Sequence, residues 1–278
     1  MTTYKVIKGT FHVKGYSPDG DSIRFRALNP AHWNYFAWSS QNKKRQTRKQ
    51  LRLEAIDALE THYQGYHQPG AFALAALEEM LGHLGIENVR YSLSVTKIVN
   101  ASDGVPGYIA SSQLDNFQRP VSFAFPDTDT LVDGEELDSH DLPLKESINY
   151  QLAAKGLVYP TFYTGLDREV INELRRVVRS ARRRSRGLWA IDRTKGFTMW
   201  DTSTIQKDVI IMPKLFRRFV SFFLRRSEMA EFIPYTKKNK DKVIIYSSGD
   251  ETSLDTLINA DGNHYGLTVL PEDMIFKP

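Results

Sequence analysis

Apolar and polar residues alternate along much of the first half of the chain, and this pattern predicts β-strands. Turn-forming residues Pro18, Asp19 and Gly20 separate the first two of these segments, so they form a predicted hairpin. The third segment stops at Asp57. The five strands that the pattern predicts cover residues 4–13, 22–26, 51–56, 89–99 and 117–125.

In four other segments, apolar residues recur about every 3.6 residues instead of every second residue, and this spacing predicts helices there. The helix after the third strand is followed by Gly85, and Asp167 is a suitable N-cap for the third helix. Further strands are predicted at 243–246 and 267–270, and a polar loop at 126–141. The four predicted helices cover residues 71–84, 148–155, 168–186 and 215–226.

Five strands with a helix after the third predict an α+β protein built on a five-stranded OB-type β-barrel with about three helices. The barrel domain is expected to cover 1–189, with insertions at 29–50 and 100–114. Residues 190–278 have a different character and are expected to form a small mixed α/β C-terminal extension.

Composition narrows the classes of function. The 278 residues include 41% hydrophobic and 12% aromatic residues, enough for a core. Cysteine is absent, which excludes disulfides, thiolate metal sites and cysteine nucleophiles. No stretch is long and apolar enough to span a bilayer, and the N-terminal residues lack the apolar run of a signal peptide, so a cytoplasmic location is expected.

Two short segments carry the candidate chemistry: 19–22, read Asp-Gly-Asp-Ser, and 52–60, which begins at Arg52 and ends at Glu60. Asp21 and Asp57 offer carboxylates to a hard cation, Glu60 offers one for proton transfer, and Arg52 suits a phosphate. This combination is typical of metal-assisted phosphodiester cleavage.

These segments, in this order, resemble the staphylococcal nuclease (thermonuclease) family. The matching segments cover most of residues 4–189 and are 19–22, 52–60, 115–120, Asn149, 156–157 and 187–189. The resemblance implies a calcium-dependent endonuclease that acts on DNA, RNA or both and leaves 3′-phosphate products. It implies that Asp21 and Asp57 ligate Ca²⁺, with the main-chain carbonyl of Ala58 as a third protein ligand.

The resemblance also assigns the remaining roles. Glu60 would be the general base toward a water, while Arg52 and Arg119 would bind the phosphate and stabilise the transition state. Aromatic side chains near the substrate map onto Phe117, Phe162 and Tyr163.

The chain departs from the family pattern in two places. Ala58-Leu59 precedes Glu60 where the family has a proline, and Gln118 stands where it prefers glycine before its second arginine. A rival register through 103–110 would put Gly107 in place of that arginine and predict an inactive enzyme. We prefer Arg119, because a strand follows it directly.

In a regular strand Arg52 and Asp57 would face opposite sides, so a break is predicted near Ala55 or Ile56. The alternative function is a non-catalytic nucleic-acid or protein-binding module on a nuclease-like barrel. The extension could direct the barrel to a protein partner. Residues 33–49 suit either base stacking or packing on the extension. The arginines of 168–186 suit a solvated face, and the helix 215–226 is expected to pack the extension onto the barrel rather than to lie on a membrane surface.

Overall fold

The structure is a computed structural model that describes residues 2–38, 47–93, 97–225 and 228–277. The chain forms two compact units, each described by itself below. Unit 1 comprises Met1–Glu54, Ala75–Leu152 and Asp167–Asn172. Unit 2 comprises Ala55–Leu74, Ala153–Leu166 and Glu173–Pro278, so it combines the C-terminal extension with two segments from the first part of the chain.

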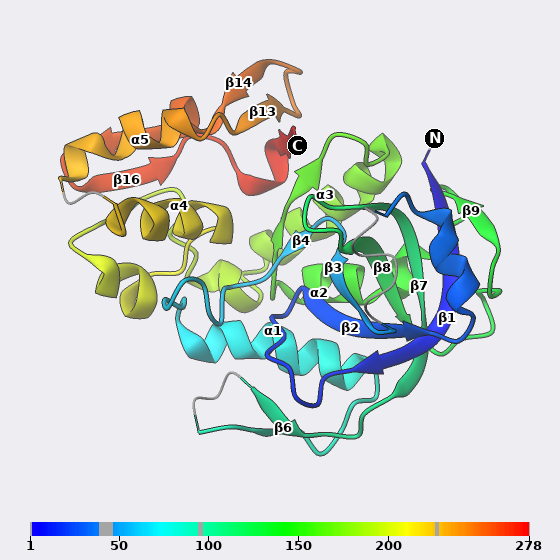
Figure 1. Cartoon of the computed structure of the whole chain (residues 1–278). Helices are drawn as coiled ribbons and strands as arrows, with labels where there is room; N and C mark the ends of the chain where they lie inside the picture. The colour runs from blue at the N-terminus through cyan, green and yellow to red at the C-terminus, as the bar shows by residue number, and fades with distance from the viewer. Residues whose placement is uncertain (1, 39–46, 94–96, 226–227, 278) are drawn as a thin grey trace. The chain divides into compact units, whose positions relative to one another are not determined.

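Unit 1 contains a closed five-stranded barrel (Figure 1). Neighbouring strands follow the order β1-β2-β3-β8-β7, and β7 pairs with β1 to close it. All pairings are antiparallel except β3 with β8, which is parallel. This order is that of an OB-type barrel, so the predicted fold class is confirmed. The strands are β1 (Thr3–His12), β2 (Ser22–Ala27), β3 (Lys49–Leu53), β7 (Val105–Leu114) and β8 (Pro120–Pro126).

The fourth barrel strand is β7, and the prediction of a strand at 89–99 was wrong. That segment holds only the short pair β5 (Arg90–Tyr91) and β6 (Ile98–Asn100), and Leu93 is fully exposed. Sequence patterning missed β7 because Pro106, Gly107 and two serines lower its strand propensity. It lies within the range 100–114 that was expected to be an insertion.

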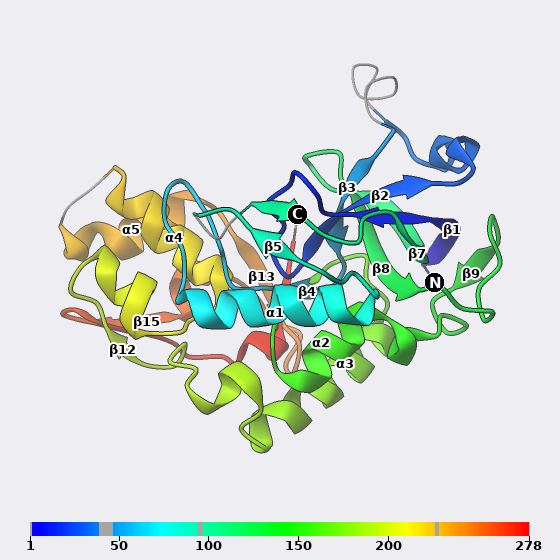
Figure 2. The same cartoon turned by 90° about the horizontal axis from the view of Figure 1, so that it is seen from below.

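Gly107 has a packing role in β7. A Cβ at this position would lie 2.6 Å from Cε2 of Phe11 and 2.6 Å from the carbonyl oxygen of Phe125. The barrel interior therefore admits only glycine there without a shift of its neighbours. Both views show β7 beside β1 and β8 (Figures 1 and 2).

Three helices contribute to both units and agree closely with the predicted ranges. They are α1 (Gly70–His83), α2 (Ile148–Lys155) and α3 (Arg168–Arg183). The predicted polar loop at 126–141 contains a short strand, β9 (Glu136–Asp138), which pairs with β1. The insertion after β2 begins with a 3₁₀ helix, Pro30–Tyr35, and residues 39–46 of the expected loop lie outside the described residues.

Unit 2 is a mixed α/β body with small sheets. One sheet has the order β11-β17-β13-β14, a second has β12-β16-β15, and β4 pairs with β10. The strands are β4 (Ile56–Asp57), β10 (Tyr159–Pro160), β11 (Phe162–Tyr163), β12 (Phe197–Thr198), β13 (Lys242–Ile245), β14 (Glu251–Ser253), β15 (Ile258–Asp261), β16 (His264–Leu267) and β17 (Met274–Phe276). The predicted strand at 267–270 was thus placed too late.

Two helices build the aromatic core of unit 2: α4 (Pro213–Phe223) and α5 (Phe232–Lys238). Phe219 of α4 stacks on Phe232 of α5 at 3.9 Å between ring centroids, and Tyr265 of β16 packs edge-on against both. The apolar face of α4 therefore packs inside this unit.

Shorter helical segments complete the described structure. Besides Pro30–Tyr35, the 3₁₀ helices are Leu144–Glu146, Gly187–Ala190, Met229–Glu231, Leu254–Leu257 and Pro271–Asp273, and Thr204–Asp208 forms a π-helical turn. Among the described residues no helix combines the length and the apolar character needed to cross a membrane.

Candidate active-site residues

Three of the predicted residues come to one edge of the barrel in unit 1. Asp21 directly precedes β2, whose first residue, Ser22, is the Cα partner of Arg52 in β3. The amide of Leu53 donates to the carbonyl oxygen of Asp21 at 2.8 Å. Arg52 is in turn the parallel partner of Val121, two residues after Arg119. Strand register alone therefore gathers Asp21, Arg52 and Arg119 at the ends of β2, β3 and β8.

The turn before β8 holds Arg119 through Asp115. Asp115 Oδ1 accepts hydrogen bonds from the amides of Phe117, at 2.9 Å, and Arg119, at 2.8 Å. Its Oδ2 accepts from Arg119 Nε at 2.7 Å, so the guanidinium is oriented by an ion pair within the turn. Phe117 is 80% exposed, with Arg119 5.6 Å from its ring centroid.

Gln118 has a left-handed backbone with φ of 61°, which explains why a glycine suits this position. Arg119 stands at the start of the last barrel strand, whereas Gly107 of the rival register lies inside β7, paired with Gly9 and Pro126. The structure thus places the arginine, and not the glycine, before β8.

The chain breaks at the end of β3, as predicted. β3 ends at Leu53, Ala55 has a positive φ of 65°, and the short strand β4 begins at Ile56. On the barrel side, Asn149 secures this end: its side chain donates to the carbonyl oxygens of Glu54, at 2.9 Å, and Ser122, at 3.1 Å. Its Oδ1 accepts from the amide of Ala124 at 3.1 Å, and Asn149 is fully buried, so its role is structural.

The other predicted acids, Asp57 and Glu60, belong to unit 2, where Arg217 of α4 binds both. Arg217 Nη2 donates to Asp57 Oδ2 at 2.7 Å and Nη1 to Oδ1 at 3.1 Å. Nη1 also donates to Glu60 Oε1. The Asp57 side chain is only 1% exposed, Glu60 13% and Arg217 20%, so the three charges are largely removed from water.

Backbone contacts hold this cluster in place. Asp57 lies in β4 opposite Tyr159 of β10. The buried Gln68 side chain accepts from the amide of Glu60 at 3.2 Å and donates to the carbonyl oxygen of Ile211 at 2.8 Å. Ile211 stands two residues before α4, so Gln68 ties the loop carrying Glu60 to the start of the helix that carries Arg217.

Burial by itself would lower the pKa of Arg217, but the adjacent Asp57 and Glu60 carboxylates outweigh it and raise the pKa well above the ordinary range. The guanidinium is therefore a permanent cation. Sequence analysis did not single out Arg217, because nothing local to α4 points to acids more than 150 positions earlier.

This arrangement does not fit a calcium ion at Asp57 as the residues stand. Both Asp57 carboxylate oxygens already accept hydrogen bonds from a cation, and Glu60 is engaged by the same guanidinium. Within the described ranges, no group of three or more His, Cys, Asp or Glu side chains is placed to hold a metal. The guanidinium supplies the positive charge that the resemblance assigns to Ca²⁺.

The remaining predicted residues differ in exposure. Ala58 is buried in unit 2, and Tyr163 is partly exposed. Phe162 is fully buried in β11, so its side chain offers no surface to a substrate.

Three arginines of α3 in unit 2 are paired with acids of later segments of that unit, which sequence analysis missed. Arg175 and Arg179 bind Asp273. Arg182 binds Glu272 at 2.9 Å and Asp192 at 3.0 Å. These side chains fasten α3 to later segments, whereas Arg176 and Arg183 are exposed and agree with the predicted solvated face.

No protein-family model matches the chain, and neither does any curated protein. Function is therefore inferred from the candidate residues of this chain and from their arrangement within each unit.

Proposed function

We propose that the chain is a nuclease that hydrolyses phosphodiester bonds of DNA, RNA or both. One observation carries this proposal: strand register brings Asp21, Arg52 and Arg119 to the same edge of an OB-type barrel. Two arginines beside a carboxylate, on a fold whose faces and loops suit nucleic acids, form a phosphate-binding arrangement.

In this proposal the arginines act on the phosphate. A guanidinium is planar and donates two parallel hydrogen bonds to phosphate oxygens, and its charge is permanent. Arg52 and Arg119 would share the negative charge that grows on these oxygens in the transition state. Asp115 preorganises Arg119 by fixing its Nε, so that less conformational entropy is lost when substrate binds.

Asp57 and Glu60 enter this proposal only after Arg217 has released them. While Arg217 donates to Glu60, that carboxylate has reduced capacity to accept a proton from a water. We therefore assign Glu60 the role of base on the resemblance alone. The calcium requirement and the 3′-phosphate products likewise come from the resemblance.

The second candidate is a non-catalytic barrel that binds nucleic acid or protein. The Arg217 cluster favours it, because an internal cation stably neutralises two acids that a nuclease would need. In this case Asp57, Glu60 and Arg217 would serve the stability of unit 2.

A cleavage assay separates the two candidates. Fluorescent single-stranded DNA and RNA are incubated with the full chain in calcium and in EDTA, alongside Arg119→Ala and Glu60→Gln. Arg90→Ala is the matched control, since it removes an exposed arginine of the same unit that lies in β5. The nuclease proposal expects Arg119→Ala to lose about 100- to 1,000-fold in rate while Arg90→Ala does not. Absence of cleavage by folded protein in every condition would leave the binding module.

A further inference from the structure

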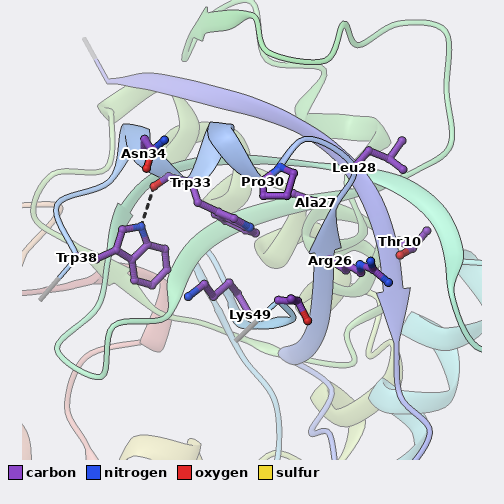
Figure 3. Close-up of a pocket in the computed structure, with 10 residues that line it drawn as sticks. Thr10, Arg26, Ala27, Leu28, Pro30, Trp33, Asn34, Trp38 and Lys49 are labelled. Atoms are coloured by element: carbon purple, nitrogen blue, oxygen red, sulfur yellow. Dashed lines mark hydrogen bonds between the residues drawn. The ribbon is translucent and has the colours of Figure 1, made fainter. Parts of the chain in front are cut away.

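A pocket in unit 1 lies at the far end of β2 and β3 from Asp21 and Arg52. Its volume is about 570 Å³, and residues from β1, β2, β3 and the insertion after β2 surround it (Figure 3). The lining residues are Thr10, Arg26, Ala27, Leu28, Pro30, Trp33, Asn34, Trp38, Thr47 and Lys49.

Two tryptophans give the pocket an aromatic wall. Trp33 and Trp38 pack edge to face, with 6.1 Å between ring centroids and 86° between planes. The indole Nε1 of Trp38 donates to the carbonyl oxygen of Trp33 at 2.7 Å, shown as the dashed line in Figure 3. Trp33 is buried against Phe25 of the barrel, whereas Trp38 is half-buried, so Trp38 is the ring that a ligand can reach.

The charged residues that line the pocket are all basic. Lys49 places its ammonium 4.2 Å from the Trp38 ring centroid and is itself buried. Burial lowers the pKa of Lys49. Arg26 is exposed, and Figure 3 shows it to the right of Lys49. Among the described lining residues none is acidic.

A basic track connects this pocket with the barrel edge. Along β2, Arg24 and Arg26 alternate with the buried Ile23 and Phe25, so they project away from the barrel interior. Arg24 stands opposite Gln50, and the next pair on this face is Ser22 with Arg52. The track consists of Arg26, Arg24 and Arg52, whereas Lys49, the partner of the buried Phe25, lies on the inward face of β3 with Leu51.

We infer that this pocket is a base-binding subsite for single-stranded nucleic acid, in which Trp38 stacks on one base and Arg26 and Lys49 bind the adjoining phosphates. The inference rests on the proposed function for the choice of ligand. Stacking on a tryptophan accepts any base, whereas the basic track follows the backbone, so the subsite would add affinity with little sequence preference.

The test is fluorescence anisotropy of labelled oligothymidylate with the full chain in EDTA, which separates binding from cleavage. Trp38→Ala is expected to weaken binding about 5- to 150-fold, the range for loss of one stacked base. Trp38→Phe keeps an aromatic face and should bind within a few-fold of the original chain. Trp200→Ala, at an exposed tryptophan of unit 2, is the control and should bind unchanged.

A second pair of variants tests the phosphate contact without touching the aromatic packing. Arg26→Gln should weaken binding and reduce its salt dependence, while Arg90→Gln, which removes the same charge from an exposed position of unit 1, should do neither. An oligonucleotide of equal charge with abasic positions should bind the original chain more weakly than oligothymidylate and bind Trp38→Ala equally.

Two results would overturn the subsite: Trp38→Ala and Arg26→Gln bind like their controls, or the original chain does not distinguish thymine from abasic positions. Neither result affects the proposed hydrolysis, which is measured separately by Arg119→Ala in calcium. Conversely, tight binding that depends on Trp38 without any cleavage would retain the subsite and reject the nuclease.

Discussion

Replacement of Arg217 by methionine tests how the two acids of unit 2 are held. Methionine keeps an unbranched side chain and removes the guanidinium, which leaves Asp57, 1% exposed, and Glu60, 13% exposed, without this cation. Removing one partner of a buried ion pair costs about 3–5 kcal/mol, because an uncompensated charge stays in a region of low dielectric. We expect Arg217→Met to lower the free energy of unfolding by that amount in urea titrations followed by tyrosine and tryptophan fluorescence.

Arg218→Met is the matched control on the same helix. Arg218 binds Asp241 through two hydrogen bonds of 2.6 and 2.7 Å, so the control also breaks a bidentate pair. Its cost should be smaller, because Asp241 is 12% exposed and keeps Lys214 at 3.5 Å. Adding Asp57→Asn to Arg217→Met should restore part of the lost stability, since the buried charge that has lost its Arg217 partner is then removed.

The free energy of unfolding in the presence of calcium is a second measurement on the same variants. If the freed acids accept a divalent cation, Arg217→Met should gain stability in calcium, by about 2.7 kcal/mol at 100 times the dissociation constant. Arg218→Met should gain none. A loss below about 1 kcal/mol for Arg217→Met would refute the ion-pair cluster itself. A full loss with no recovery in calcium would show that the acids serve stability, and it would favour the binding module.

Three further predictions concern the barrel. Asn149→Ala should lower the free energy of unfolding by about 2–4 kcal/mol in urea titrations, because buried backbone groups lose their partner; a loss under 1 kcal/mol would contradict its structural role. Gly107→Ala should lower the free energy of unfolding by about 1–3 kcal/mol through overpacking. Gly82→Ala, at a position of α1 with open space around it, should raise the free energy of unfolding by about 0.5–1 kcal/mol. Equal effects of the two variants on the melting temperature would argue against the packing role of Gly107. Burial alone would raise the pKa of Asp103, but hydrogen bonds from backbone amides and from His12 outweigh burial and lower this pKa. The stabilisation by Asp103 is therefore present above the unfolded pKa near 3.9 and is lost as pH falls through the lower folded value. Asp103→Asn should flatten the loss of stability below about pH 4, and an unchanged loss of stability in acid would contradict this.

The barrel was largely predictable from sequence because large apolar residues alternate with polar or small residues in several of its strands, including β8, which is buried on both faces. β1, β2 and β8 follow from local alternation, and the helices α1 and α2 from their period and the glycines that follow them. The exception, β7, carries Gly107, which the barrel needs for close packing and which lowers strand propensity. Local pattern therefore failed where a tertiary requirement chose the residue.

The candidate site was predictable only in part, for a related reason. The edge formed by Asp21, Arg52 and Arg119 follows from strand register, and the break before Asp57 follows from the need to change faces. The Arg217 cluster joins residues separated by 157 and 160 positions. The sequence around an arginine on an amphipathic helix does not indicate which acid it pairs with, so the partner is identified only from the folded structure.

The positions of the arginines also change what the net charge means for a partner. The chain has a formal charge of +4 and an arginine-rich helix, which together suggest a basic surface on α3. In unit 2, however, Arg175, Arg179 and Arg182 are paired with acids of the same unit, as are Arg217 and Arg218 of α4. Charge that is paired internally contributes little to attraction of a polyanion, because the field of each pair falls off rapidly with distance. In the described part of unit 1, β2 and β3 also carry basic residues, with Arg24, Arg26 and Arg52 on the outward face and Lys49 on the inward face. Arg26 and Lys49 line the aromatic pocket, so the barrel is the unit in which the proposed subsite should be tested, while the ion pairs of α3 and α4 contribute to the folding of unit 2.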